Sequence, residues 1–106
     1  MSQRTRVDNV TRHLLKVLRE HYQPGHPDAD IQAYRYNSAS IRLRIVDPGF
    51  ADIPFSQRDQ EVWRVLKKHL SADTLSQLSL ILLLAPEEQA DSMMNMEFDV
   101  PSPTRL

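Results

Sequence analysis

The sequence contains four histidines, and two of them lie near carboxylates along the chain. The four are His13, His21, His26 and His69. His21 and His26 could hold a metal ion together with Asp28 and Asp30, because imidazole and carboxylate groups are common zinc ligands. The segment 23–28 contains two prolines and a glycine, which is typical of a surface loop. We therefore interpret these residues as loop residues and expect no metal ion or other cofactor.

The sequence shows no motif for nucleophilic or acid–base catalysis. It has no cysteine, which excludes disulfides, thiolate metal sites, iron–sulfur clusters held by its own thiolates and cysteine nucleophiles. None of the serines stands in a Gly-x-Ser-x-Gly motif, and no pair of acidic residues has a supporting motif. We expect a protein that is not an enzyme.

Three arginines could contact the phosphates of a nucleic acid if a sheet brought them together. They are Arg35, Arg42 and Arg44, within a segment that predicts a β-hairpin over residues 31–46 with a turn at 37–40. A register that pairs like with like puts the three arginines on one face. The other face then carries Tyr34, Tyr36, Ile41, Leu43 and Ile45. Because arginines on such an open face are usually only solvated, nucleic-acid binding is the alternative interpretation.

A helix is predicted before this hairpin. Apolar residues recur at helical spacing between residues 10 and 22, namely Val10, Leu14, Val17, Leu18 and Tyr22. Asp8 or Asn9 can cap its first turn. The basic residues of this segment fall on the opposite side and are expected to face water.

A second helix and a third strand should follow the hairpin. Segment 61–70 has apolar residues at helical spacing, and Ser56 and Asp59 have the spacing of a capping box. Ser71 can cap a short further turn, and segment 80–85 is apolar throughout, as in a strand covered on both faces. The connection is long enough for a right-handed helical crossover, so the third strand should lie parallel to the second.

Together these elements predict an α+β fold in the order α-β-β-α-β. Its three-stranded mixed sheet should carry both helices on the face of Tyr34, Tyr36, Ile41, Leu43 and Ile45. Residues 1–7 are expected to form a flexible N-terminus, residues 8–88 a single domain and residues 89–106 a C-terminal tail.

Three segments of the chain, residues 46–52, 57–63 and 78–88, resemble the BolA family. BolA proteins carry a Phe-x-Gly turn after the second strand, an Arg-His pair followed by a Val-Tyr pair in the central helix, and a last strand that ends in Thr-Pro-Glu-Glu. The residues that match directly are Phe50, Arg58, Val62 and Pro86. The resemblance covers residues 8–88 and implies a fold related to class II KH domains.

The resemblance also implies partners. BolA proteins pair with monothiol glutaredoxins around a 2Fe–2S cluster, using a histidine just before the last strand and a Cys or His from the hairpin loop. Here Ser76 stands at the first position, residues 37–40 hold neither ligand type, and Asp52 and Asp59 replace a glycine and a histidine of the family. Hydroxyl and amide groups are poor ligands for such clusters, so we expect no cluster sharing with a glutaredoxin-type partner. The Gly-x-x-Gly loop through which KH domains clamp nucleic acid is also missing.

The uninterrupted apolar strand is the strongest candidate for an interaction surface. Its residues are Leu80, Ile81, Leu82, Leu83 and Leu84. One alternate set must face away from the helices, where a monomer seldom leaves such a stripe bare. The methionines and Phe98 of the tail could fold over it, but the polar, proline-bearing tail favours a protein partner or homodimer with the tail contributing. We therefore expect a non-catalytic adaptor or regulatory module, with nucleic-acid binding as the alternative.

The composition sets few further limits. A net charge of −1 gives no long-range attraction to nucleic acids or anionic membranes. The first six residues lack an apolar signal core, and no run approaches the roughly 18 apolar residues of a membrane span. A cytoplasmic protein without a membrane partner is the expectation.

Overall fold

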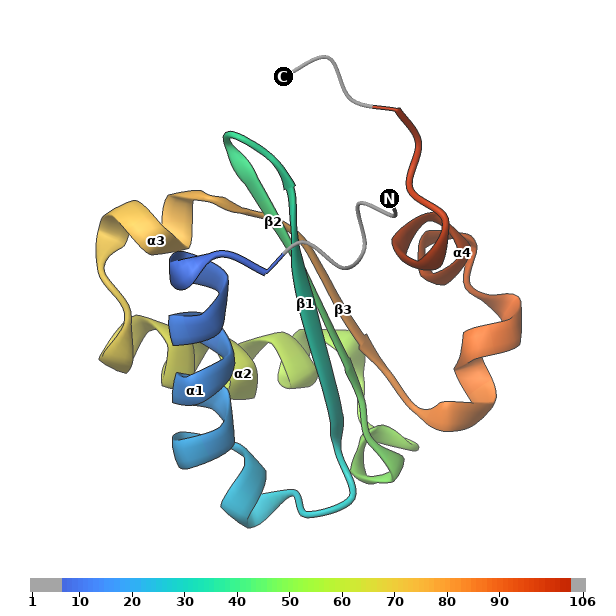
Figure 1. The fold of residues 1–106 in the computed structure, drawn as a ribbon. Coiled ribbons are helices and arrows are strands. Elements are labelled where there is room, and N and C mark those ends of the chain that lie inside the picture. Colours follow the sequence, from blue (N-terminus) through green and yellow to red (C-terminus); the bar gives the residue numbers. More distant parts are fainter. Residues whose placement is uncertain (1–6, 104–106) are drawn as a thin grey trace.

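The computed structural model of the chain describes residues 7–103, which form a three-stranded sheet with helices on both faces (Figure 1). The strands are β1 (Asp30–Asn37), β2 (Ser40–Val46) and β3 (Leu78–Leu84), and they lie in the order β1-β2-β3. β1 and β2 pair antiparallel, whereas β2 and β3 pair parallel. The predicted α+β class, hairpin and parallel crossover are confirmed. The expectations for residues 1–6 and 104–106 lie outside the described residues.

The helices divide between the two faces of the sheet. α1 (Asn9–His21), α2 (Phe55–His69) and the short α3 (Ala72–Ser76) lie on one face, and α4 (Met93–Asp99) lies on the other (Figure 1). The connecting 3-10 segments are η2 (Gln23–Gly25), η3 (Pro48–Phe50) and η4 (Pro86–Asp91). The prediction that helices cover only one face is wrong, because the chain continues past β3 through η4 and turns back onto the sheet. No helix within the described range is long and apolar enough to cross a membrane.

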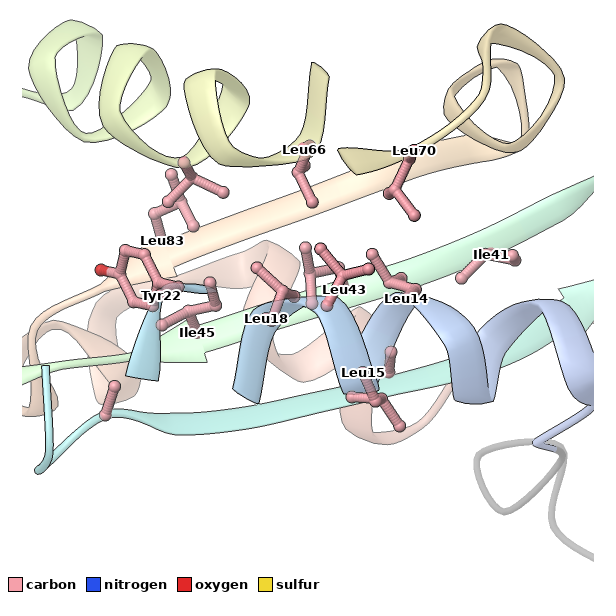
Figure 2. Packing of buried hydrophobic residues seen from close by; sticks show 14 of the residues in the cluster. Leu14, Leu15, Leu18, Tyr22, Ile41, Leu43, Ile45, Leu66, Leu70 and Leu83 are labelled. Carbon is pink, nitrogen blue, oxygen red and sulfur yellow. The ribbon is translucent and has the colours of Figure 1, made fainter. Parts of the chain in front are cut away.

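The main core fills the space between the sheet and helices α1 and α2 (Figure 2). Its completely buried members are Leu14, Leu18, Ile41, Leu43, Ile45, Val62, Leu66 and Ala85. The period of two along β2 and the helical periods of α1 and α2 all direct apolar side chains into this space. The sequence patterns that predicted these three elements therefore also predicted their buried sides.

The starts of the helices are set by polar caps and by a proline. Asp8 caps α1 and Ser71 caps α3, each accepting a hydrogen bond from the backbone N–H three residues later, at 2.9 and 3.1 Å. These two predictions are confirmed. α2 instead begins directly after Pro54, whose carbonyl accepts from the N–H groups three and four residues later. Ser56 lies inside that first turn, so the predicted capping box is wrong.

The register of the hairpin differs from the predicted one. The turn at residues 38–39 places Tyr34 opposite Arg42 and Arg35 opposite Ile41. Residues directly opposite on paired strands share a face. Tyr34 therefore lies with Arg42, and Arg35 lies on the side of α1. The predicted face shared by Arg35 and the arginines of β2 is wrong, because a slip of one residue exchanges the two faces of a strand.

A second, smaller core lies between the other face of the sheet and α4. It consists of Tyr34, Leu82, Leu84 and Phe98, with the partly buried Tyr36 and Leu80 packed against it. The Tyr34 hydroxyl donates to the carbonyl of Phe98 at 2.8 Å, and the two rings meet edge to face with centroids 4.9 Å apart. Tyr34 and Tyr36 were expected in the main core, and the register places them here instead.

The apolar stripe of β3 is covered by the chain itself. Leu82 and Leu84 belong to the core beneath α4, with Leu80 at its edge, while Leu83 and the partly buried Ile81 belong to the main core. Of the two ways in which the stripe could be covered, the structure shows the folded-back C-terminal segment. These leucines are therefore not available as a broad exposed surface.

Truncation of Phe98 tests whether α4 packs on the sheet. Phe98 is 1% exposed, and removal of a buried aromatic ring costs about 3–5 kcal/mol, so we expect Phe98→Ala to lower the free energy of unfolding by that amount. Met96→Ala is the matched control on the same helix and should change it by less than about 0.5 kcal/mol. Urea denaturation followed by circular dichroism measures both. Equal stabilities of the two variants would show that α4 does not cover the sheet.

Candidate protein-binding surface

The sheet separates Arg35 from the other two arginines of the hairpin. Its Nε donates to Oδ2 of Asp8 at 2.8 Å, and Arg35 is buried. This ion pair connects β1 to the start of α1. Arg35 therefore cannot form a common phosphate site with Arg42 and Arg44.

Arg42 and Arg44 lie beneath α4, where carboxylates of the C-terminal segment neutralise them. Arg42 Nη1 donates to Oε2 of Glu97 at 2.6 Å, and Arg44 Nη1 donates to Oδ1 of Asp99 at 3.1 Å. Hydrogen bonds from Ser102, together with that from Arg42, lower the pKa of Glu97 from 4.5 to about 2. The two arginines that the sequence offered for phosphate binding are thus occupied by acidic groups of the same chain.

The outer side of α4 carries exposed apolar side chains. Met93, Met96 and Val100 are 85%, 71% and 74% exposed. Their spacing of three and four residues places them in one row along the helix, here called the α4 stripe. Methionine side chains are flexible and polarisable, so they can adapt to apolar partners of different shape. Such a row is a candidate contact surface for another protein.

A groove of about 540 Å³ lies beside the α4 stripe, and we call it the α2–α4 groove. It is lined by residues of α2, β3 and the η4–α4 segment: Phe55, Leu82, Leu84, Glu87, Glu88, Asp91, Ser92 and Met94. Leu82 and Leu84 are buried and form its floor, whereas Phe55 and Met94 are 60% and 46% exposed. The groove therefore combines an apolar floor with accessible apolar and acidic edges.

A buried arginine fixes one side of the α2–α4 groove. Arg58 donates from Nη1 and Nη2 to the two carboxylate oxygens of Glu88, at 2.7 and 3.0 Å. It also donates to the carbonyls of Ile53 and Leu83, and its guanidinium lies 4.3 Å from the ring centroid of Phe55. The hydrogen bonds from Arg58 lower the pKa of Glu88 from 4.5 to about 2. This network joins the start of α2, the end of β3 and η4.

Another hollow lies on the outer side of α2. The described residues that line it all belong to this helix, and they are Asp59, Gln60, Trp63, Arg64 and Lys67. Because a single helix supplies all of its described lining, these residues would enclose a ligand less than those of the α2–α4 groove. We therefore regard it as the weaker candidate.

A polar cluster that no sequence pattern indicated surrounds His26. The two ring nitrogens of His26 lie 2.9 Å from the carboxylate of Asp47 and 2.5 Å from that of Glu61. Its ring stacks on Tyr22 with centroids 4.1 Å apart, and the Tyr22 hydroxyl donates to Asp47 at 3.4 Å. Burial, followed by the two neighbouring carboxylates, raises the pKa of Tyr22 far above its usual range. Since both nitrogens of His26 are occupied, the cluster joins η2, the end of β2 and α2 rather than presenting a free base.

The residues considered as a metal site do not converge. His21 stacks on His69 with ring centroids 3.6 Å apart, whereas His26 belongs to the cluster described above. Among residues 7–103 no group of three or more possible ligands could hold a metal ion. Ser76, at the ligand position implied by the BolA resemblance, donates its hydroxyl to the carbonyl of Asp73 at 2.6 Å.

Loss of the Glu88 carboxylate should destabilise the chain near the groove. Glu88→Gln leaves the buried guanidinium of Arg58 without its anion, which costs about 1–3 kcal/mol in the free energy of unfolding at neutral pH. Glu87→Gln is the matched control, because the neighbouring Glu87 is exposed, and it should change stability by less than about 0.5 kcal/mol.

The lowered pKa values of Glu88 and Glu97 predict a pH dependence of stability. Glu88 and Glu97 have folded-state pKa values of about 2 against an ordinary 4.5, so the unfolded chain binds more protons in this window. The stabilisation is complete above pH 4.5 and is lost as the pH falls toward 2. Urea denaturation at a series of pH values should show this loss, with a smaller slope in a Glu88→Gln/Glu97→Gln variant. An unchanged slope in that variant would contradict the assignment.

Comparison with known proteins identifies no relative of the chain. No family model matches it, and neither does any curated protein or any solved structure. The α4 stripe and the α2–α4 groove are therefore interpreted from their own geometry and chemistry.

Proposed function

We propose that this chain is a non-catalytic adaptor or regulatory module that binds another protein through the α4 stripe and the α2–α4 groove. The position of its exposed apolar residues carries the proposal. Within residues 7–103, the large hydrophobic side chains that are exposed belong to the first residue of α2 or to α4 and its end: Phe55, Met93, Met94, Met96 and Val100. Such a concentration on one side of a small domain is typical of a protein interaction surface.

The polar groups elsewhere support binding rather than catalysis. Arg42, Arg44 and Arg58 each pair with a carboxylate, and His26 has both ring nitrogens engaged. These contacts hold elements of the fold together. The groove itself adds carboxylates, one serine and apolar side chains, without a histidine or lysine that could act as a base.

The proposal includes a BolA-like fold. The order α1-β1-β2-α2-β3, with β2 parallel to β3, is the order that the sequence resemblance implies. The matching residues have structural roles, since Phe50 and Val62 are buried and Arg58 pairs with Glu88 just beyond Pro86. In this proposal α4 is an addition that covers the second face of the sheet and creates the binding surface.

The geometry of Arg35, Arg42 and Arg44 does not favour nucleic-acid binding, the alternative function. Arg35 lies across the sheet from Arg42 and Arg44, and all three have carboxylate partners. Phosphate contacts would require these ion pairs to break first. Protein binding needs no such rearrangement.

We expect no cluster sharing with a monothiol glutaredoxin. Ser76 offers a hydroxyl, and the hairpin turn at residues 38–39 offers neither imidazole nor thiolate. Adding the chain to a cluster-loaded monothiol glutaredoxin should therefore leave the visible absorption and circular dichroism spectra unchanged. Ser76→His, which supplies an imidazole on the same backbone, is the comparison variant. A shift to a mixed-ligand spectrum with the unaltered chain would overturn this expectation.

Photo-crosslinking from the α4 stripe tests the proposed function. Benzoylphenylalanine in place of Met96 should give a defined crosslinked product with another protein in native lysate, and nuclease treatment should leave the product intact. The same photoreactive residue in place of Lys67, on the outer side of α2, is the control and should not give that product. Adding Met93→Ser and Val100→Ser should reduce the yield from position 96, because the contact loses apolar area.

Two results would contradict the proposed function. One is the absence of a defined product from position 96. The other is the same product from positions 96 and 67, since that would indicate crosslinking without a preferred surface.

A further inference from the structure

The edge of the α2–α4 groove carries carboxylates that form no ion pair with other residues in the described range 7–103. Glu87 and Asp91 are exposed residues of η4 that line the groove, and neither forms an ion pair with another described residue. Glu88 differs from them because Arg58 neutralises it. The lining therefore presents two negative charges beside an apolar floor.

We propose that the α2–α4 groove binds a segment of the partner protein that carries both apolar and basic side chains. Apolar side chains of the segment contact the exposed Phe55 and Met94 above the buried floor, and its Lys or Arg side chains pair with Glu87 and Asp91. This inference rests on the proposed function and names the chemistry of its partner. Complementary charges at the edge of an interface favour the correct partner and its orientation, while the exposed apolar side chains of the lining contribute most of the affinity.

The shape of the groove agrees with this occupant. Its volume of about 540 Å³ accommodates several side chains rather than a whole domain. The Arg58–Glu88 pair holds one side in place, whereas the flexible Met94 on the other side can adapt to the bound segment. A side that is already ordered reduces the entropy lost on binding.

A second copy of the chain is a poor occupant of the same groove. The exposed apolar residues of a second copy lie on α4 and at Phe55, and the same lining includes Glu87 and Asp91 of that copy. Their approach would bring carboxylates toward the carboxylates of the groove, which disfavours association. The exposed Lys67 and Lys68 lie in the last turn of α2, at the opposite end of the helix from Phe55.

Two synthetic peptides with opposite charge can test the proposal. Each has about fourteen residues in the same amphipathic pattern, one built from Leu and Lys and the other from Leu and Glu. Fluorescence anisotropy with the full chain should show saturable one-to-one binding of the Leu/Lys peptide. The Leu/Glu peptide should not bind. Raising the salt concentration from about 0.05 M to about 0.5 M should weaken the Leu/Lys complex, because the ion pairs are near the surface.

Matched charge variants locate the binding site. Glu87→Gln/Asp91→Asn should weaken the Leu/Lys complex about fivefold to tenfold, as expected for two exposed ion pairs. Glu20→Gln/Asp73→Asn removes the same charge from α1 and α3 on the opposite side of the sheet (Figure 1). This control should stay within about twofold of the unaltered chain. Met94→Ser should also weaken the complex, while far-ultraviolet circular dichroism shows that each variant remains folded.

The outcomes separate this inference from the proposed function. Equal weakening by the two charge variants would show unspecific attraction and would overturn the inference. A failure of the Leu/Lys peptide to bind would also overturn the inference. If position 96 still gave its crosslinked product in that case, the proposed function would stand, with a partner of other chemistry. Self-association in sedimentation that Met94→Ser abolishes would assign the groove to a second copy and would overturn the inference as well.

Discussion

The pairing across the hairpin turn decides which side chains meet on each face of the sheet. Asn37 Oδ1 accepts from the N–H of Ala39 at 2.9 Å, and Asn37 pairs with Ser40. This register gathers aromatic and cationic groups on one face of the sheet. Water leaves the aromatic groups exposed, and a purely apolar layer would bury the cationic groups without partners. α4 covers both kinds of group: Phe98 packs on the aromatic and apolar side chains, and Glu97 and Asp99 pair with the arginines. The exposed methionines lie on the outer side of the same helix, so the candidate surface follows from the register.

The main core could be predicted from the sequence because the pattern of each element is compatible with only one buried side. The alternation in β2 and the helical spacing in α1 and α2 identify one apolar side for each element. β1 is different, since Tyr34 and Arg35 both combine an apolar body with a polar end and can lie on either face. α4 had a local sequence signal in Ser92, because serine is a favoured N-cap residue. In the structure its hydroxyl accepts from the backbone N–H of Asn95 at 3.1 Å. That signal, followed by Phe98, indicates a short helix with one buried aromatic residue.

The α2–α4 groove could not be predicted from local sequence patterns. Arg58 and Glu88 are 30 positions apart in the sequence, and they meet only because the crossover brings the start of α2 beside the end of β3. The BolA resemblance identified Arg58 as a matching residue but did not identify its partner. The cluster of His26 and Asp47 spans 21 positions and was missed for the same reason. The first contact joins α2 to η4, and the second joins the end of η2 to the residue after β2. His26, which looked like a candidate for chemistry, therefore contributes to the architecture.

The exposed thioethers of α4 make this surface sensitive to oxidants. Met93, Met94 and Met96 are accessible, whereas Phe98 on the inner side of the helix is buried. Oxidation of a methionine to its sulfoxide adds a polar oxygen to an apolar side chain and can be reversed enzymatically. Because the chain has no cysteine, peroxide would act among residues 7–103 first on the methionines of α4. The packing of α4 on the sheet would stay intact while the apolar character of its outer side decreased.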